Sequence, residues 1–421
     1  MTTEQRTDAP VVPLSRNRNY QILWGSQALS IFGVNATFIA FPLLVLALSG
    51  SAAASGLVLG VSAAAELVAG IPAGALADRW DRKKIMLGCE AVQTVTTAGL
   101  VLALWWHVAN VAMLLVVAAV LGACEAMFRP SETASLPNIV PTEQVSGAIS
   151  MNAARAYLGN LSGTAAGGFL FAIGRFVPFA ANLVAHAGSF VALLFLRLPA
   201  RAGPPPAPVH HLGAEMVTGL RFMWSHRHIR VTALCAVVLN LFFSAFYIVV
   251  IVLARTRGTP AGEIGIMVAM LGVGGIAGAF AAPWLTKRLR PYLSIISVFW
   301  TLTVLTPLAV FVHNGYVMGG LFAAMALLPP AANTAIMTEQ LLRTPDELRG
   351  RLSGVLGVLA GVAVALGPTL GGALAQVVSG TAAVLLCSAG IAVVTVLVTL
   401  SPTLRHFPAQ PVPNEKGTTD E

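Results

Sequence analysis

The sequence contains twelve long runs of mainly apolar residues, and these runs restrict the chain to an α-helical membrane protein. A helix needs roughly 20 apolar residues to cross a bilayer, and it pairs its own backbone groups where water is absent. Only 10% of the 421 residues are charged, which is too few to cover a water-exposed surface of this size. We predict twelve transmembrane helices near residues 20–48, 52–77, 85–106, 108–136, 145–173, 176–197, 229–254, 262–286, 291–312, 315–339, 352–376 and 380–400.

Basic residues are concentrated in every second connection between these runs. Arg16 and Arg18 precede the first run, and four basic residues lie at positions 79–84 after the second. The opposite connections hold only Arg175, Arg255 and Arg257. Because arginine- and lysine-rich loops stay in the cytoplasm, we expect both termini to be cytoplasmic. That orientation requires an even number of spans.

A polar segment in the middle of the chain separates two sets of six runs. Within it, Met216, Leu220, Met223 and Trp224 share one helical face. They predict a short amphipathic helix, which either lies on the inner leaflet or packs within the linker. The predicted order is a cytoplasmic segment (1–19), a six-helix bundle (20–197), a linker (198–228), a second six-helix bundle (229–400) and a cytoplasmic tail (401–421).

The two halves resemble each other at a nearly constant offset of 204 or 205 residues. The matched positions include Gly74 with Gly278, Gly163 with Gly367, and Asn35 with Asn240. An even number of spans per repeat gives both copies the same orientation in the membrane. The copies are then related by an axis along the membrane normal, and a substrate site is expected between them near the midplane.

The connection between the second and third runs holds the most specific motif, residues 74–84 with the sequence GALADRWDRKK. It resembles the loop 2–3 signature of the major facilitator superfamily at nearly every position. The resemblance implies a fold of two six-helix halves and a cytoplasmic latch that joins them in the outward-open state. The alternative is that the basic residues of this loop only keep it on the cytoplasmic side of the membrane and form no latch. The latch residues would be Gly74, Asp78, Arg79, Asp81 and Arg82.

The fifth and eleventh runs carry glycine-rich motifs. Small residues allow helices to approach each other closely, and proline adds a bend. The first motif resembles that of major facilitator drug–proton antiporters, with Thr164 where proline is usual. It indicates either export or tight packing without directional meaning. The packing residues are Gly159, Gly163, Gly167 and Gly168 in the fifth run, and Gly367, Pro368, Gly371 and Gly372 in the eleventh.

Ionisable residues inside the spans are candidates for proton coupling or for holding substrate charge, because such groups are costly in lipid. Glu125, Arg129 and Glu132 share one helical face if the helix continues through the intervening proline. We expect these three residues either to bind a substrate or a proton, or to form a ladder of ion pairs along the helix. Glu66, in the middle of the second span, suits either a proton carrier or a hydrogen bond between helices. Arg155 is expected to neutralise a carboxylate.

Two further ionisable residues are interpreted structurally. Glu90 lies about a turn and a half into the third span, where we expect its side chain to snorkel or to pair with Arg82. His186 in the sixth span is expected to be a hydrogen-bonded packing residue, and a proton relay is the alternative.

Polar and aromatic side chains mark a predicted cavity. Asn35 and Phe38 lie on the first span, Asn240 and Phe243 on the seventh, and Asn333 on the tenth beyond a double proline. The first and seventh spans line the cavity in the major facilitator superfamily. We expect the asparagines either to contact the substrate or to form hydrogen bonds with neighbouring helices.

The order of motifs resembles a bacterial exporter branch of this superfamily, which contains the enterobactin exporter and macrolide-efflux proteins. The motifs include the sequences WGSQ at 24–27, LPNIVP at 136–141 and GLRFMWSH at 219–226. The resemblance implies a multi-pass protein of the bacterial inner membrane that exports a small-to-medium amphipathic molecule by proton antiport. An uptake symporter and a non-transporting receptor or partner subunit are the alternatives.

The expected partners follow from this interpretation. They are a small-molecule substrate, protons and the lipid bilayer, with the protein acting as a monomer. We expect no cofactor, metal site, nucleic-acid partner or enzymatic activity, because the glycine-rich runs lie in the spans and the sequence contains no phosphate-binding loop or metal-ligand cluster.

Overall fold

The computed structural model describes residues 13–198 and 212–402. Within these ranges the chain forms fourteen α-helices, two short 3-10 helices and no strands. The predicted terminal segments and linker fall partly outside the described residues. The helices are α1 (Arg18–Ser49), α2 (Ala52–Arg79), α3 (Arg82–Trp105), α4 (Val111–Ser135), η1 (Leu136–Asn138), η2 (Thr142–Gln144), α5 (Val145–Ile173), α6 (Val177–Leu194), α7 (Leu212–Ser225), α8 (Arg227–Thr256), α9 (Ala261–Arg288), α10 (Pro291–Leu308), α11 (Gly315–Leu327), α12 (Pro329–Arg343), α13 (Asp346–Val377) and α14 (Gly380–Leu400).

These helices confirm the predicted all-α membrane fold. The structure places a helix over each of the twelve runs, and the tenth run is divided at Leu328 into α11 and α12. Eleven described helices or helix pairs are long and apolar enough to cross a membrane. The twelfth is α5, which is less apolar because it is rich in glycine and carries Arg155. Its 29 residues run beside α1 and α9, so it has the length and surroundings of a span.

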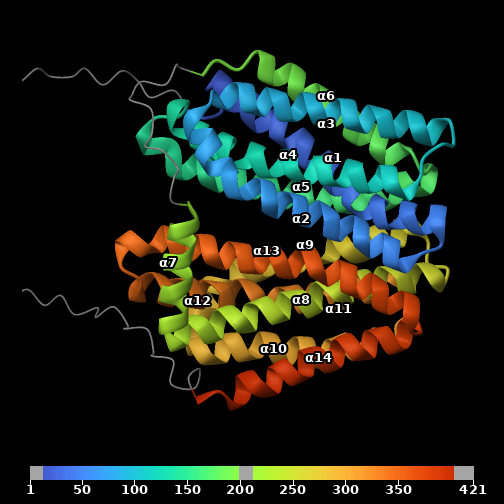
Figure 1. Cartoon of the computed structure of the whole chain (residues 1–421), viewed down its shortest axis with the longest axis vertical. Helices are drawn as coiled ribbons and strands as arrows, with labels where there is room; N and C mark the ends of the chain where they lie inside the picture. The colour runs from blue at the N-terminus through green and yellow to red at the C-terminus, as the bar shows by residue number, and fades with distance from the viewer. Residues whose placement is uncertain (1–12, 199–211, 403–421) are drawn as a thin grey trace, which may run out of the picture.

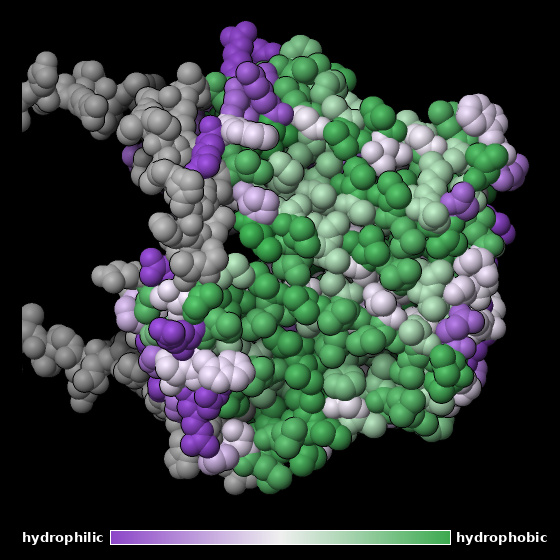
Figure 2. All heavy atoms as spheres, viewed as in Figure 1, coloured by the Kyte–Doolittle hydropathy of each residue, from purple (hydrophilic) through white to green (hydrophobic). Residues whose placement is uncertain are grey.

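The helices form two bundles whose axes run in the same general direction (Figure 1). One contains α1–α6 and the other contains α8–α14, while α7 lies across the helix ends of the second bundle. The start of α1 and the end of α14 lie at the same end of the molecule, which we call the terminal face. Apolar side chains cover much of the visible bundle surface between the two ends (Figure 2).

Side-chain caps begin several of the helices. Asn17, Ser51, Asp81 and Asn110 accept hydrogen bonds from backbone N–H groups in the first turns of α1, α2, α3 and α4. These caps satisfy donors that would have no partner inside the helix. Gly50, with φ of +67°, ends α1 in the left-handed conformation.

The bundles touch backbone to backbone at the end opposite the terminal face, which we call the far face. A Cβ added to Gly56 of α2 would lie 2.9 Å from the Cα of Gly372 in α13. A Cβ added to Gly168 of α5 would lie 2.7 Å from the Cα of Gly265 in α9. The Ala52 N–H also donates to Gln376 Oε1 at 2.8 Å. The far face is therefore closed.

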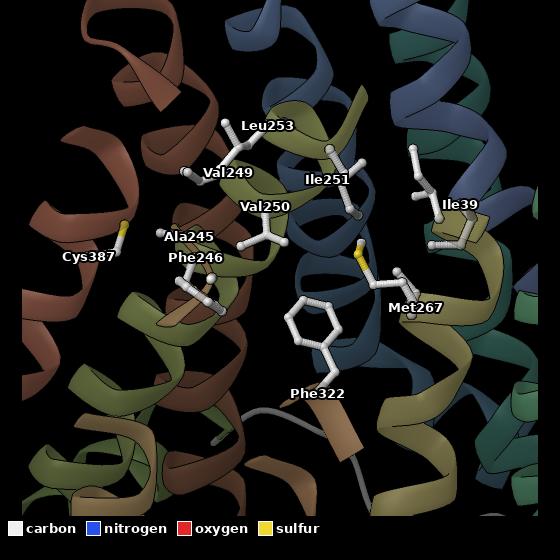
Figure 3. Close-up of a cluster of buried hydrophobic side chains, with 14 of the residues drawn as sticks. Ile39, Ala245, Phe246, Val249, Val250, Ile251, Leu253, Met267, Phe322 and Cys387 are labelled. Atoms are coloured by element: carbon white, nitrogen blue, oxygen red, sulfur yellow. The ribbon is translucent and has the colours of Figure 1, made fainter. Parts of the chain in front are cut away.

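A continuous apolar core reinforces this closure. Residues 39–45 of α1 and 248–254 of α8 are all buried. Each stretch is about two helical turns long, so its side chains point to every side of the helix. Figure 3 shows Ile39 of α1 near Met267 and Ile251 of the other bundle. Full burial around both helices means that the bundles share one core near the far face.

The bundles separate toward the terminal face. A cavity of about 590 Å³ lies between α2 and α13, and Met216 of α7 also lines it. The indentation between the halves is visible in Figure 2. No atom lies within 4 Å of a Cβ placed on Gly350, Gly354 or Gly357 of α13. The same helix pair is thus in contact at one end and open at the other.

The linker helix α7 packs on the second bundle. Met223 is fully buried there, whereas Leu220 and Trp224, on the same predicted face, are exposed. A Cβ on Gly219 would lie 2.6 Å from the Arg351 carbonyl oxygen, so α7 packs tightly on α13. The packing of α7 is therefore observed, while contact of its exposed apolar residues with the inner leaflet stays a prediction.

The glycine motifs do pack helices, and this can be tested at Gly163. A Cβ there would lie 2.5 Å from the Phe32 carbonyl oxygen and 2.9 Å from the Cβ of Asn35. We expect Gly163→Val to force α5 away from α1 and to cost about 1–3 kcal/mol of stability. Thermal unfolding of the purified protein, followed by tryptophan fluorescence, would show a lower Tm. Gly99→Val is the matched control, because nothing lies within 4 Å of its Cβ position. Equal losses in both variants would contradict this account.

Candidate functional site

Among the described residues that line the cavity between the bundles, one is a carboxylate, Glu66 of α2. Within the described part of the chain, Glu66 takes part in no hydrogen bond or ion pair. It is half-buried and lies midway along a membrane helix. A carboxylate in this position is free to bind a proton or a cationic group entering the cavity.

A second carboxylate lies beside it on α4. Gly122 packs against the backbone of Ser62, and Gly70 lies 4.0 Å from the Ala126 Cβ, measured from its own Cβ position. Glu66 and Glu125 therefore lie at similar depth along two packed helices. Glu125 Oε1 is 3.8 Å from Arg129 Nη2, and the Arg129 side chain is 69% exposed. An ion pair this long and this exposed is a weak interaction, so Arg129 stabilises the Glu125 carboxylate only weakly.

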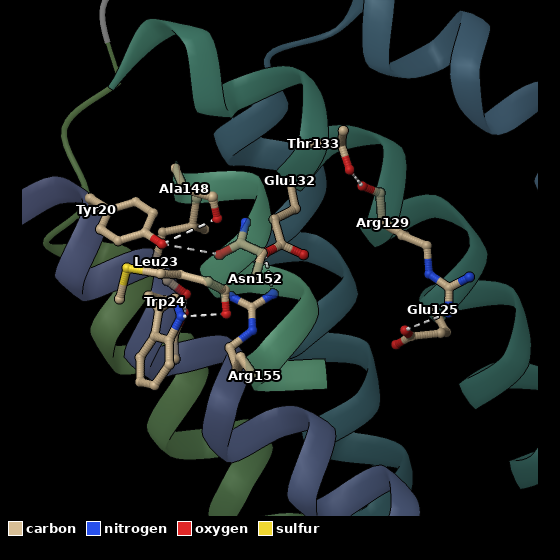
Figure 4. Close-up of polar contacts among 12 residues, drawn as sticks. Tyr20, Leu23, Trp24, Glu125, Arg129, Glu132, Thr133, Ala148, Asn152 and Arg155 are labelled. Atoms are coloured by element: carbon tan, nitrogen blue, oxygen red, sulfur yellow. Dashed lines mark hydrogen bonds and ion pairs between the residues drawn. The ribbon is translucent and has the colours of Figure 1, made fainter. Parts of the chain in front are cut away.

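Glu132 has a different environment from its two predicted companions. Its Oε1 accepts a 2.6 Å hydrogen bond from Arg155 Nη2, and both residues are buried (Figure 4). Helix α4 continues through Pro130, which was the condition for the three residues to share one helical face. The predicted three-residue group is nevertheless divided, because α5 supplies a partner for Glu132 and leaves Arg129 with Glu125. Arg155 does neutralise a carboxylate, as predicted.

This ion pair belongs to a polar junction near the terminal face. The Tyr20 hydroxyl lies 3.4 Å from both the Ala148 carbonyl oxygen and Asn152 Oδ1, and Trp24 Nε1 donates to the Met151 carbonyl at 3.3 Å. Figure 4 shows these groups gathered where α1 meets α5. The junction holds α1, α4 and α5 together. Breaking a buried ion pair leaves an uncompensated charge, so Arg155 and Glu132 stabilise this junction jointly.

Two of the predicted latch residues, Asp81 and Arg82, make hydrogen bonds within the first bundle. Asp81 caps α3 by accepting from the Lys83 N–H at 2.9 Å. Arg82 donates to the carbonyl oxygens of Ala77 at 3.2 Å and Ala134 at 2.5 Å, which end α2 and α4.

The other latch residues lie at the open end of α2. Gly74 is exposed, with nothing within 4 Å of its Cβ position, and Arg79 is exposed as well. The Asp78 side chain lies outside the described residues. The described hydrogen bonds of Asp81 and Arg82 fall within the first bundle.

A second pocket lies inside the other bundle. It has a volume of about 370 Å³ and is mainly apolar, with Asn240, Phe243 and Asn333 among its lining residues. The double proline Pro329-Pro330 starts α12 after the break at Leu328 and also lines the pocket. The broken helix therefore contributes directly to this space. An apolar pocket with two amides suits an amphipathic organic group.

Asn35 does not share the role predicted for its repeat partner Asn240. Its Oδ1 accepts from Asn160 Nδ2 at 3.0 Å, and its own Nδ2 donates to the Ile31 carbonyl. The helix–helix hydrogen bond is therefore the better of the two interpretations. Phe38 remains 45% exposed, and its ring centroid lies 6.0 Å from that of Tyr247 in the other half.

Sequence reasoning missed a polar cluster behind this site. Glu90 Oε2 lies 2.8 Å from His186 Nδ1, and Glu90 Oε1 accepts from Ser189 at 2.8 Å. The expected pairing of Glu90 with Arg82 is wrong, because Arg82 instead bonds the ends of α2 and α4. Both Glu90 and His186 are fully buried between α3 and α6. The spacing of polar residues along α3 and α6 is the signal that would have found the cluster.

The fold and site agree with comparisons to known proteins. A family model described as "Transmembrane secretion effector" matches residues 8–417. The chain belongs to this family of the major facilitator superfamily. It is 28% identical over 394 residues to the multidrug efflux pump Tap of Mycolicibacterium fortuitum, covering 89% of this chain and 93% of that protein. It is 27% identical over 405 residues to the enterobactin exporter EntS of Shigella dysenteriae, covering 93% and 94%.

Solved transporter structures share the fold. The nucleoside transporter NupG matches with a TM-score of 0.71 at 12% identity, over 91% of this chain and 98% of that one. A bacterial homologue of the human lysosomal transporter Spinster, solved in an inward-facing and unoccupied conformation, matches with a TM-score of 0.67 at 17% identity, over 93% and 95%. These matches confirm the major facilitator fold predicted from the loop motif.

Whether α2 and α13 approach each other at the terminal face can be tested by placing a bulky residue on α13. Gly354 lines the cavity and has free space around its Cβ position. We expect Gly354→Leu to fit the present conformation but to prevent α2 and α13 from approaching. Spin labels at Lys84→Cys and Arg290→Cys, on a background without native cysteines, would report the separation of the bundles. Wild type should show two distance populations and Gly354→Leu only the longer one.

The control for this experiment is Gly320→Leu, because its Cβ position is equally free but lies on α11 away from the cavity. It should keep both distance populations. A short population that persists in Gly354→Leu would show that α2 and α13 do not close there.

Proposed function

We propose that this protein is a secondary active efflux transporter that exports a small-to-medium amphipathic organic molecule by proton antiport. The observation that carries the proposal is the unpaired Glu66 in a cavity that is open toward the terminal face, between bundles closed at the far face. Such a cavity is one state of an alternating-access cycle. The full-length kinship with proteins named as an efflux pump and an exporter supports the direction.

The charge distribution of the connections supports an orientation in the bacterial inner membrane. The arginine-rich connections lie on the terminal face, so the positive-inside rule places this face and both termini in the cytoplasm. The cavity then accepts substrate from the cytoplasm. One chain contributes both bundles and the space between them, so a monomer suffices for transport.

The cycle we infer is a rocking of the bundles around the site. Small residues on the open ends of α2 and α13, among them Gly70, Gly74 and Gly354, allow these helices to meet without displacing large side chains. The glycine contacts at the far face would separate at the same time. Asp78 and Arg79 would then reach the start of α13 and act as the latch.

Charge and shape support a substrate that is cationic or neutral and amphipathic. The first bundle supplies acidic side chains at the membrane interior, because Glu66 lines the cavity and Glu125 lies near Glu66 on α4. The second bundle offers the apolar pocket with Asn240 and Asn333. A proton bound at either carboxylate removes its negative charge and so weakens its hold on a cation. Proton entry from outside would therefore favour substrate release.

Export can be measured as ethidium accumulation in an efflux-deficient bacterium, with and without a protonophore. We expect cells that express the protein to accumulate less ethidium, and the protonophore to abolish the difference. Increased accumulation would instead indicate uptake. No change with ethidium or a wider antibiotic panel, with the protein shown in the membrane, would count against the proposal.

Glu66→Gln and Glu125→Gln test the carboxylates in the same assay. We expect each variant to reach the membrane and to lose most of the protonophore-sensitive export, because neither amide can take up a proton. The control is Glu143→Gln, since Glu143 is exposed in η2 outside the cavity. If Glu66→Gln and Glu125→Gln both keep full proton-coupled export, the assignment of proton coupling to these two carboxylates is wrong.

The apolar pocket can be filled without a clash. Gly275 lines it and has nothing within 4 Å of its Cβ position. We expect Gly275→Leu to fold normally and to raise the apparent KM for a bulky substrate, with a smaller effect on kcat. Gly320→Leu, outside the pocket, should leave both constants unchanged. Unaltered kinetics in Gly275→Leu would remove this pocket from the transport pathway.

A further inference from the structure

A buried polar stripe lies inside the first bundle, away from the cavity. Its centre is the Glu90–His186 pair, with Ser189 bonded to the carboxylate and the Ser30 hydroxyl 3.3 Å from His186 Nδ1. All four residues are at most 4% exposed. Three helices contribute, since Ser30 lies on α1, Glu90 on α3, and His186 and Ser189 on α6.

Further polar side chains extend the stripe along the same helices. Gln93 and Thr97 follow Glu90 at i+3 and i+7 on α3, while Asn182 precedes His186 by four residues on α6. On the described helices α1, α3 and α6, polar atoms of five buried side chains have no hydrogen-bond partner in the protein: Gln27, Gln93, Thr97, Asn182 and His186 at its Nε2. Seven residues of helix span about 10 Å, so the stripe extends over a substantial part of the bundle.

Apolar side chains seal the stripe at both ends. Toward the terminal face, Leu23, Met86 and Leu193 are at most 1% exposed, and each lies four residues from a polar member of the stripe on its own helix. Toward the far face, Phe179 is fully buried and packs edge-to-face on Phe41 with ring centroids 5.1 Å apart. The stripe is a buried polar region with apolar side chains at both ends.

We propose that Glu90 and His186 together bind one proton that is exchanged during transport, in a water-holding compartment separate from the substrate cavity. With one proton the pair has no net charge, whether the proton lies on the carboxylate or on the imidazole. Burial penalises a net charge, so the sealed compartment retains that proton. The proton leaves when one of the seals opens to water. The unpartnered amide and hydroxyl groups supply the polar contacts that bound waters require.

The surrounding ionisable groups connect this site with the cavity. Glu125 of α4 lies within electrostatic range of both His186 and Glu66. Cys89 of α3 and Cys124 of α4 lie against each other beside the pair. The ionisable groups of α1 are confined to its first turn, at Arg18 and Tyr20.

Arg155 of α5 is neutralised by Glu132. Glu125 is thus the charge whose change would alter proton affinity at the buried pair. A cation or proton that neutralises Glu125 would favour proton release from Glu90 and His186. This inference rests on the proposed proton-coupled export.

The protonation state of His186 can be measured directly. Protein labelled with ¹⁵N-histidine, in lipid nanodiscs, gives ring-nitrogen signals that report tautomer and charge. His186→Gln assigns the signal by its loss. His186 Nδ1 lies 2.8 Å from Glu90 Oε2, so loss of the shared proton from either group changes the charge or the tautomer of the imidazole. We expect the His186 signal to show such a change as the pH is varied, and to shift in Glu90→Gln. A His186 signal that keeps one charge state and one tautomer throughout would overturn the proposal.

Transport provides the second readout. In proteoliposomes we expect a proton gradient to accelerate ethidium transport by wild type, and Glu90→Gln to run at the rate seen without a gradient. Ser388→Ala is the control, because it removes one buried hydrogen bond, to the Val384 carbonyl oxygen, in the second bundle and away from the polar stripe. It should retain the acceleration. Full acceleration in Glu90→Gln would overturn the proposal.

The two readouts separate this inference from the proposed function. If wild type does not transport ethidium or the wider panel, export is in doubt while the His186 titration still decides whether the pair exchanges a proton. If Glu90→Gln fails to fold, the wild-type titration decides in the same way. If wild type exports with proton coupling but His186 does not titrate, only the second proton site is wrong.

Discussion

Contact between glycine backbones at the far face is the constraint on which the rest of the structure depends. Gly56 against Gly372, and Gly168 against Gly265, bring helices of different bundles closer than any side chain would allow. Because the bundles meet there, two helix segments are buried on all sides and the apolar core runs through both bundles. The bundles then diverge toward the terminal face, which creates the cavity. The closed far face and the open cavity at the terminal face therefore both follow from the glycine contacts between the bundles.

The two bundles share a fold but differ in chemistry. The first carries the buried charges, namely the Glu132–Arg155 ion pair and the Glu90–His186 pair. The second has an apolar pocket with amide groups and a helix interrupted at Leu328. Charge buried in a bundle needs partners on neighbouring helices, so the first bundle is tied together by specific polar contacts. The division suggests separate tasks, with ionisable groups in one half and apolar recognition in the other.

Several features of the site could be predicted because they depend on residue type and spacing. Glu66 stands alone in an apolar run, and it lies in the cavity. Asn240 and Asn333, singled out from the repeat and the double proline, line one pocket. Other assignments failed because the deciding partner is distant in sequence. Glu90 is 96 residues from His186, and Glu132 is 23 residues from Arg155. Helical spacing shows which residues share a face, but not which helix packs on that face.

The sequence by itself determined the number of membrane helices, their approximate ends and their division into two similar halves. Hydropathy and a repeat offset suffice for this, since lipid requires every span to satisfy its own backbone. Tertiary structure alone decided which face is closed, which glycines meet and which carboxylates are already paired. Those outcomes depend on the relative position of helices that are far apart in the chain. Glycines occur toward both ends of α2 and α13, so only the packed structure shows at which end these helices are in contact.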